Sequence, residues 1–399
     1  MFKTTPFYER LAPLNETGLW SHWSGYLVPR KFRMDDKVEY FAVRNSAALF
    51  DTSPLYKYRI SGADAERFLA GVLVRDIRVC RDGQAQYTVW CDDRGYVVED
   101  GVVFRMSSDE FMLTSAEPNF AYFRNLVGSL RVSIEDISAD FGALAVQGPR
   151  ARQILELLAP EVVDLKFFEH AEMKVGDVPV RISRTGYTGD LGYEIWVASG
   201  DANRLWDVVA TASEGYGVLP AGQNVLVMTR IEAGLILIGV DFHSSRFALT
   251  DNERTTPTEL GLGWMLGGLA KSDRRFVGRK AIEREIADKA SRWKTVGLVI
   301  DWQDWNRVYE RAGLIPPKDI TPVTGEIMLY DVDGQQIGYT TSMMYSPILQ
   351  RHIAIGRVQP HLSPVGSHVH VERTIHHHYT SVKATVTKSP LFNPARKTS

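Results

Sequence analysis

The sequence predicts an α+β protein of three domains, two of α+β type followed by a small C-terminal β-barrel. At 399 residues, the chain is longer than one hydrophobic core usually holds. Up to about residue 270, segments that alternate like strands are interspersed with segments of helical spacing, as in an α+β fold. From Trp293 onward the chain has only short strand-like segments with turn residues between them.

The first domain is predicted to be discontinuous, with residues 1–54 and 140–270. Residues 38–50 have helical spacing. The chain returns to this domain with a strand at 142–146, and Gln147-Gly148-Pro149 then begins a helix that runs to about Leu158. Further helices are expected at 206–214 and around 230–235, and a polar loop at 243–256.

The second domain is predicted to cover residues 55–139. Its strand at 56–60 is followed by a helix whose start is marked by Gly62-Ala63-Asp64. Two further strands are joined by the turn Asp92-Asp93-Arg94-Gly95. The elements expected in this domain are strands at 56–60, 86–90, 96–105, 111–114 and 132–137, and helices at 63–73 and 119–130.

The third domain is predicted to cover residues 271–399. A charged helix at 271–290 connects it to the rest of the chain. The strands expected after it are 295–300, 327–330, 336–341, 352–358, 368–371 and 382–386. Short strands of this spacing indicate a small β-barrel.

Composition excludes several classes of protein. The net charge of −2 provides no basic field that would attract nucleic acid. No uninterrupted apolar segment of about 18 residues is present, so no membrane-spanning helix is expected. The first six residues lack the apolar core of a signal sequence. Cys80 and Cys91 form no Cys-x-x-Cys pair or disulfide framework, which favours the reducing cytoplasm.

Residues 183–197 read as a strand end, a glycine-rich turn and a second strand. Tyr193 and its alternate neighbours share one face of that strand, which places Glu194 and Trp196 on the other. Burying a carboxylate beside an indole is costly unless hydrogen-bond donors meet it. Two interpretations follow: Glu194 lies in solvent, or it accepts two parallel N–H groups of a flat ligand.

No metal site is expected. His368 and His370 share a strand face, but no Asp or Cys stands at a ligand spacing from them. The run 376–378 would point to alternating faces of a strand, so its imidazoles would not converge. Phosphate-binding, dinucleotide-binding, zinc-protease and serine-hydrolase motifs are also missing from the sequence.

The stretch from Arg184 to Glu194, Arg-Thr-Gly-Tyr-Thr-Gly-Asp-Leu-Gly-Tyr-Glu, resembles the signature of the glycine-cleavage T-protein family, the aminomethyltransferases. The superfamily also contains tetrahydrofolate-dependent demethylases. Further matching segments are 45–53, 229–235, 255–259 and 389–392. The resemblance covers nearly the whole chain and implies three domains around a central channel for tetrahydrofolate, and an enzyme of one-carbon transfer.

The resemblance also implies roles for particular residues. Asp100 matches an aspartate that lies beside the reacting folate nitrogens, and Tyr87 matches a tyrosine of the same region, so both are candidate catalytic residues. A fixed carboxylate there could orient an amine or accept its proton. The alternative for Asp100 is an ordinary strand-end aspartate. Glu194 would accept the paired donors of the pterin, Tyr187 would pack beside it, and Trp196 is a further cofactor-binding candidate.

Arg230 and Glu232 lie in a segment that matches the family's Leu-Arg-Leu-Glu-Ala-Gly-Leu. Arg230 either contacts the cofactor or forms an internal ion pair, and for Glu232 we expect the internal ion pair. T-proteins carry an arginine four residues earlier that holds the folate tail, whereas this chain has Leu226. This departure favours the demethylase branch.

Three functions therefore stay open. The first is methyl transfer from an O-, S- or N-methyl small molecule to tetrahydrofolate. The second is aminomethyl transfer in glycine cleavage, with a lipoyl carrier protein as partner. The third is folate binding without catalysis, against which the presence of Asp100 argues. An ether donor would need a proton donor for its leaving group, and the sequence singles none out.

Overall fold

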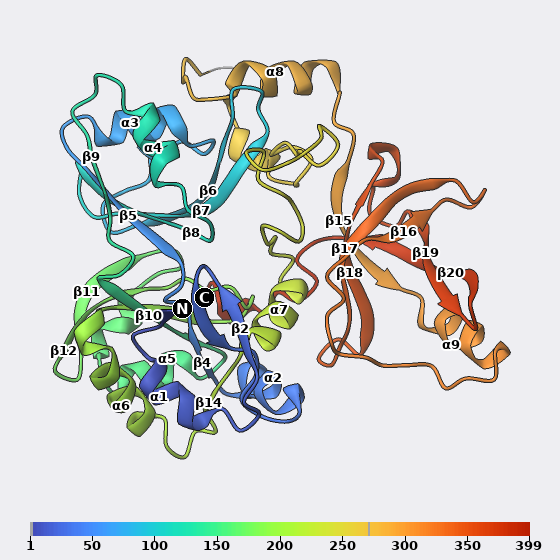
Figure 1. Cartoon of the computed structure of the whole chain (residues 1–399), viewed down its shortest axis with the longest axis horizontal. Coiled ribbons are helices and arrows are strands. Elements are labelled where there is room, and N and C mark those ends of the chain that lie inside the picture. The colour runs from blue at the N-terminus through green and yellow to red at the C-terminus, as the bar shows by residue number, and fades with distance from the viewer. Residues whose placement is uncertain (1–2, 270–271) are drawn as a thin grey trace.

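The structure is a computed structural model that describes residues 3–269 and 272–399, in which two α+β domains lie beside a closed β-barrel (Figure 1). The predicted fold class is thereby confirmed. The boundary predicted between residues 270 and 271 lies outside the described residues. Within the described part of the chain, no helix is both long and apolar enough to cross a membrane.

The first domain is built on a six-stranded sheet with the order β11-β12-β13-β10-β4-β14. Its strands are β4 (Ala48–Asp51), β10 (Phe141–Gln147), β11 (His170–Val175), β12 (Val178–Ser183), β13 (Gly192–Ala198) and β14 (Leu219–Pro220). The sheet thus joins one strand from before residue 54 to five from after residue 140. The domain's helices are α1 (Tyr8–Leu11), α2 (Asp36–Asn45), α5 (Ala151–Glu156), α6 (Ala202–Ala212) and α7 (Gln223–Glu232). A separate small sheet contains β1 (Lys3–Thr4), β2 (Trp20–Trp23) and β3 (Tyr26–Pro29).

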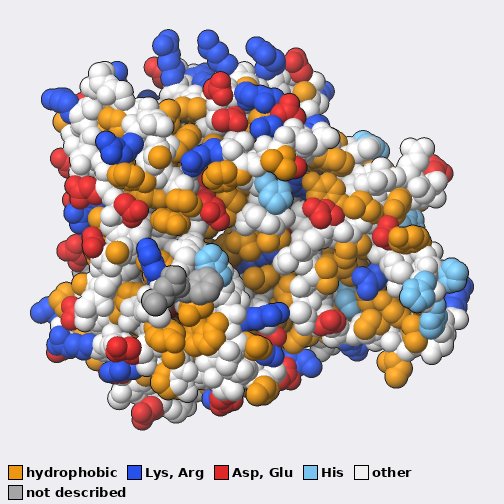
Figure 2. Space-filling model, viewed as in Figure 1, with side chains coloured by type: hydrophobic (Ala, Val, Ile, Leu, Met, Phe, Trp, Pro, Cys, Tyr) orange, Lys and Arg blue, Asp and Glu red, His pale blue; other side chains and the backbone are white. Residues whose placement is uncertain are grey.

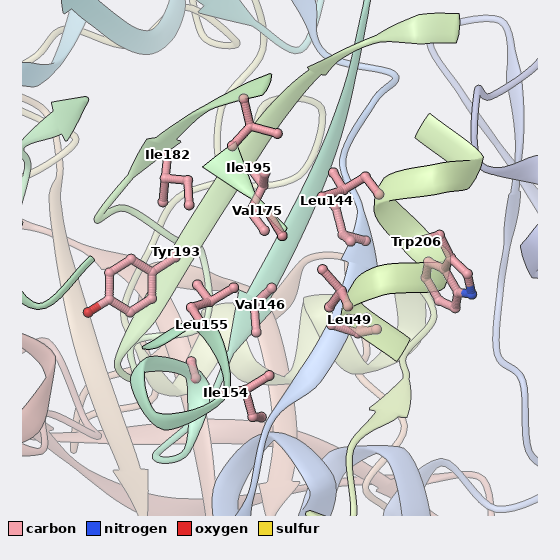
Figure 3. Packing of buried hydrophobic residues seen from close by; sticks show 14 of the residues in the cluster. Leu49, Leu144, Val146, Ile154, Leu155, Val175, Ile182, Tyr193, Ile195 and Trp206 are labelled. Carbon is pink, nitrogen blue, oxygen red and sulfur yellow. The ribbon is translucent and has the colours of Figure 1, made fainter. Parts of the chain in front are cut away.

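One face of the six-stranded sheet carries the largest hydrophobic core. Tyr193 and Ile195 of β13 point into it together with Leu144 and Val146 of β10 (Figure 3). The alternation predicted for this strand is therefore present. As a consequence, Glu194 and Trp196 project from the opposite face.

The helix predicted over residues 38–50 is wrong at its C-terminal end. α2 ends at Asn45, and Ala48–Asp51 form β4, which lies between β10 and β14. Both faces of β4 are buried, with Leu49 in one cluster and Ala48 and Phe50 in another. A short run that is apolar on both faces has no period that separates a strand from the end of a helix.

The second domain is a five-stranded antiparallel sheet with the order β6-β7-β8-β5-β9. Its strands are β5 (Tyr56–Ser61), β6 (Ala85–Cys91), β7 (Val97–Arg105), β8 (Glu110–Ser115) and β9 (Ser133–Asp136). Helices α3 (Ala65–Val72) and α4 (Phe120–Leu126) cover one face. The other face packs against apolar side chains from residues 236–282, including Phe242 and Leu260.

The closed barrel contains the six strands predicted for it, in the order β15-β18-β17-β16-β19-β20. They are β15 (Lys294–Ile300), β16 (Ile327–Tyr330), β17 (Gln336–Ser346), β18 (Arg351–Val358), β19 (His368–Ile375) and β20 (His378–Thr387). The observed connecting helix, α8 (Arg279–Asp288), is shorter than the helix predicted over 271–290.

The prediction that only strands and turns follow Trp293 is wrong at one α-helix, α9 (Trp302–Arg311). The side chain of Asp301 caps its first turn by accepting the N–H of Asp304 at 2.8 Å. Trp305 and Tyr309, four residues apart, are both buried. This cap and spacing were the sequence signal for the helix.

Candidate active site

Asp100 and Tyr87 lie on neighbouring strands of the second domain and point from the same face of the sheet. Asp100 of β7 pairs with Val89 of β6, and Tyr87 is the next β6 residue on that face. The Tyr87 hydroxyl donates to Oδ2 of Asp100 at 2.8 Å. The structure therefore brings the two predicted catalytic residues together, in a mid-strand position rather than a turn.

Burial is the main reason that the pKa of Asp100 rises to about 6, although the hydrogen bond from Tyr87 opposes this rise. The adjacent Glu99 is completely buried, and its pKa is raised by burial and then by the negative charge of Asp100. Burial and the charge of Asp100 also raise the pKa of Tyr87. Asp100, with a pKa of about 6, is therefore ionised at neutral pH, while burial and this neighbouring charge both favour the protonated form of Glu99.

Tyr187 reaches the same place from the first domain. It lies in the turn between β12 and β13, and its hydroxyl donates to the carbonyl of Ile236. Burial raises its pKa, the charge of Arg230 opposes this rise, and the charges of Asp100 and Asp241 add to it. The turn of the first domain and the sheet of the second therefore contribute to one site.

The candidate side chains combine partial exposure with desolvation. Tyr87, Asp100, Tyr187 and Glu194 are all partly exposed, yet surrounding protein atoms desolvate each of them enough to raise its pKa. Partial exposure combined with strong desolvation is typical of residues in a recess rather than on a convex surface. Figure 2 shows a hollow near the middle of the molecule, where the three domains meet.

Glu194 has one engaged and one open carboxylate oxygen. Its Oε2 accepts the hydroxyl of Thr185, which in turn is 2.7 Å from the hydroxyl of Ser183. No described residue is hydrogen-bonded to Oε1, and the side chain is partly exposed. Burial raises the pKa of Glu194, while the Thr185 hydrogen bond opposes this. Oε1 is thus free to accept an N–H group from a ligand.

The glycine-rich turn before Glu194 is packed around Gln147. A Cβ added to Gly186 or Gly192 would overlap the amide of this side chain. That amide donates to the carbonyls of Thr185 and Tyr193 and accepts the hydroxyl of Thr188 at 2.9 Å. This close packing of Gly186 and Gly192 around Gln147 fixes the turn that carries Tyr187.

Arg230 is completely buried and is paired within the protein. Its guanidinium lies 2.6 Å from Oδ2 of Asp241 and donates to the Ser342 hydroxyl of the barrel at 2.6 Å. Asp241 also accepts the hydroxyl of Thr341 and the N–H of Leu237. Of its two predicted roles, the structure shows the ion pair, which fastens the 236–241 segment to the barrel.

Glu232 forms the internal ion pair expected of it. Its Oε2 accepts Arg44 at 2.5 Å, and its Oε1 accepts the hydroxyls of Tyr40 and Ser346 at 2.5 Å each. This network fastens α2 and the C-terminal end of α7 to β17.

Trp196 lies on the face predicted, but it is only 3% exposed. Its ring packs edge-on against Phe104 of the second domain, with the ring centres 5.6 Å apart. The structure places it between the two α+β domains, on the same strand face as the partly exposed Glu194.

Leu226 of α7 lines a small pocket with Trp23 and Phe50. The described residues that line this pocket include no lysine or arginine. At the position where T-proteins have an arginine, the surroundings are therefore mainly apolar.

The described residues contain no group of three or more His, Cys, Asp or Glu that could hold a metal ion. His376 and His377 have φ of 50° and 64° and form the turn between β19 and β20, so they do not continue a strand as expected.

Two residues near Asp100 were not identified from the sequence. Asp241, in an irregular segment, has no pattern that marks it. For Glu99, the sequence did contain a usable signal. Glu99 and Asp100 are adjacent acids in an otherwise apolar strand, so one of them must face the core.

Comparison with known proteins agrees with this arrangement. Residues 9–268 match the family model of the GCVT N-terminal domain, and residues 310–393 match that of the glycine cleavage T-protein C-terminal barrel domain. The aminomethyltransferase of Caldanaerobacter subterraneus subsp. tengcongensis is 31% identical over 376 residues, which is 92% of this chain and 91% of that protein. The trimethylamine-oxide aldolase of Ruegeria pomeroyi is 30% identical over 409 residues, 99% of this chain but 48% of that protein.

A solved structure shows the same fold. It is the glycine cleavage system aminomethyltransferase T from Bartonella henselae, with a TM-score of 0.81, 23% identity, and coverage of 98% of this chain and 99% of that one. Enzymes of this family depend on tetrahydrofolate. The chain therefore belongs to the glycine cleavage T-protein family of one-carbon transferases.

Proposed function

We propose that this enzyme is a tetrahydrofolate-dependent demethylase, which moves a methyl group from an O-, S- or N-methyl small molecule to tetrahydrofolate. Its cofactor-binding residues are Glu194 and Tyr187, and its catalytic residues are Asp100 and Tyr87. The observation that carries the proposal is the approach of Tyr187, from the first domain, to the hydrogen-bonded pair of Tyr87 and Asp100 in the second.

The residues present fit a reduced pterin. Oε1 of Glu194 has no hydrogen-bond partner among the described residues, which leaves it available for the N–H groups along one edge of the ring. The partly exposed ring of Tyr187 offers a flat surface nearby. When bound, tetrahydrofolate supplies the nucleophilic nitrogen that accepts the one-carbon unit.

The protein's own contribution is to orient the reactants and to hold a proton. Tyr87 fixes Asp100 through the 2.8 Å hydrogen bond, so the carboxylate can orient an N–H group and accept its proton. A base with a pKa of about 6 is ionised at neutral pH and can still be protonated transiently. Orientation of the two reactants can contribute about 7–11 kcal/mol to lowering the barrier.

Leu226 favours demethylation over glycine cleavage. Its largely apolar pocket has no cation that would hold a folate tail in the T-protein manner. Aminomethyl transfer with a lipoyl carrier protein as partner is the second candidate, favoured by the names of relatives such as that from Caldanaerobacter. A cytoplasmic location belongs to the proposal and is supported by Cys80 and Cys91, which are buried free thiols.

The test is product analysis. The enzyme is incubated with tetrahydrofolate and either methylated compounds or an aminomethylated lipoyl carrier protein, and the folate products are separated by chromatography. 5-Methyltetrahydrofolate is expected from a methylated compound, and Asp100→Asn should abolish it while the exposed control Asp93→Asn should not. Formation of 5,10-methylenetetrahydrofolate alone would establish the second candidate instead.

A further inference from the structure

The carboxylates of the candidate site have no cationic partner. Among residues 3–269 and 272–399, no basic side chain forms an ion pair within 4.0 Å of Glu99, Asp100 or Glu194. By contrast, the nearby buried carboxylates Asp241 and Glu232 are both paired with arginine. Asp100, which is ionised at neutral pH, is therefore a negative charge without a cation beside it.

Three arginines in this region are directed to other groups. Arg75 donates to the backbone carbonyl of Tyr87 at 3.4 Å. Arg230 is paired with Asp241 at 2.6 Å. Arg357 donates to the carbonyl of Asp241 and to the hydroxyl of Tyr339 at 3.1 Å. The charge of Asp241 still acts on Asp100, because it contributes to raising the pKa of the Asp100 carboxyl. A desolvated recess with this charge favours a cationic ligand.

Both tyrosine hydroxyl groups of the site already donate their protons in hydrogen bonds. Tyr87 donates its proton to Asp100, and Tyr187 donates its proton to the carbonyl of Ile236. Burial raises the pKa of both phenols above its ordinary value of 10, so neither gives up a proton readily. Neither phenol is therefore placed to protonate a leaving alkoxide, whereas a leaving group that departs neutral needs no acid.

We propose that the methyl donor is an onium compound, a quaternary ammonium or a sulfonium, rather than an ether. This inference rests on the proposed function. The positive centre lies beside Asp100 and close to Tyr87 and Tyr187, whose aromatic rings can contribute cation–π contact. The bond between the methyl carbon and the onium atom breaks, and its electron pair returns to nitrogen or sulfur. The methyl carbon bonds to the folate nitrogen, whose proton passes to Asp100 or to solvent, and a neutral amine or sulfide leaves.

The first experiment measures charge recognition without turnover. Choline and its neutral carbon analogue, 3,3-dimethyl-1-butanol, have nearly the same shape, and their binding to the protein without folate is compared by calorimetry. Choline is expected to bind at least about tenfold more tightly. Asp100→Asn should remove most of this difference, whereas Asp93→Asn should preserve it. Equal binding of the two compounds to the wild type overturns the proposal, whether or not Asp100→Asn folds.

The second experiment measures turnover with matched donors. Trimethylammonio-, dimethylsulfonio- and methoxyacetate form one series, and trimethylanilinium, dimethylphenylsulfonium and anisole form another. 5-Methyltetrahydrofolate is expected from ammonium or sulfonium donors and not from the ethers. Turnover of the ethers alone overturns the onium inference and leaves the proposed demethylase standing. If no donor reacts and only the lipoyl carrier gives product, the proposed function fails, and the binding experiment still decides the charge preference.

Discussion

Replacing Arg230 by methionine tests whether this residue holds the structure together or contacts the cofactor. The substitution leaves Asp241, whose side chain is 1% exposed, without its cation. It also removes the 2.6 Å hydrogen bond to Ser342. Breaking a buried ion pair by removing one partner costs about 3–5 kcal/mol, because the remaining charge stays buried.

The size of the effect can be converted into a melting temperature. A cooperative unit of about 150–250 residues loses about 2–4 °C per kcal/mol, so Arg230→Met should melt about 6–20 °C lower. Arg230→Met combined with Asp241→Asn removes the stranded charge and keeps an oxygen for the N–H of Leu237. The double variant should therefore be more stable than Arg230→Met alone.

The assay combines thermal and urea unfolding with calorimetric measurement of folate affinity. Arg10→Met is the matched control, since its ion pair with Asp207 is solvent-exposed and should leave the unfolding midpoint nearly unchanged. A double variant no more stable than the single would refute the ion-pair argument. Restored stability together with lost folate affinity would show instead that Arg230 contacts the cofactor.

Three further outcomes are expected. Asp100→Asn should lower kcat by about 10²–10⁴ while Tyr87→Phe lowers it less, measured as methyl transfer under saturating substrates. The wild-type rate should rise as the pH passes through about 6, where Asp100 ionises. Because the pKa of Asp100 is raised in the folded protein, the stability that this residue contributes is present at low pH and is lost as the pH rises through about 6. Asp100→Asn should therefore melt at a higher temperature than the wild type at pH 8 but not at pH 4. Gly186→Ala should destabilise the fold by about 1–3 kcal/mol by displacing the hydrogen-bonded Gln147, while Gly200→Ala, with open space around it, should be nearly neutral in urea unfolding.

What could be predicted from the sequence were features with a short-range cause. The alternation of residues 193–197 fixes which face carries Glu194, and three nearby glycines mark a turn that must pack closely. The six barrel strands were identifiable for the same reason.

What could not be predicted depends on contacts between distant segments. Whether Arg230 faces a ligand or Asp241 is decided by how the 236–241 segment folds back onto α7, and the helical pattern is the same in both cases. Trp196 shares a strand face with Glu194, yet Phe104 of another domain covers only one of the two. For β4, burial from both sides arises only once the sheet is assembled.

The same contacts indicate how the barrel can influence the site without contributing a residue to it. Ser342 and Thr341 of β17 bind Arg230 and Asp241, and Asp241 in turn holds the backbone of Leu237. The carbonyl of Ile236, one residue earlier, accepts the Tyr187 hydroxyl. A displacement of β17 would therefore move the acceptor that fixes Tyr187. It would also change the distance from Asp241 to Asp100, and with it the pKa of Asp100. Through these contacts, β17 influences both the position of Tyr187 and the pKa of Asp100, which belong to the other two domains.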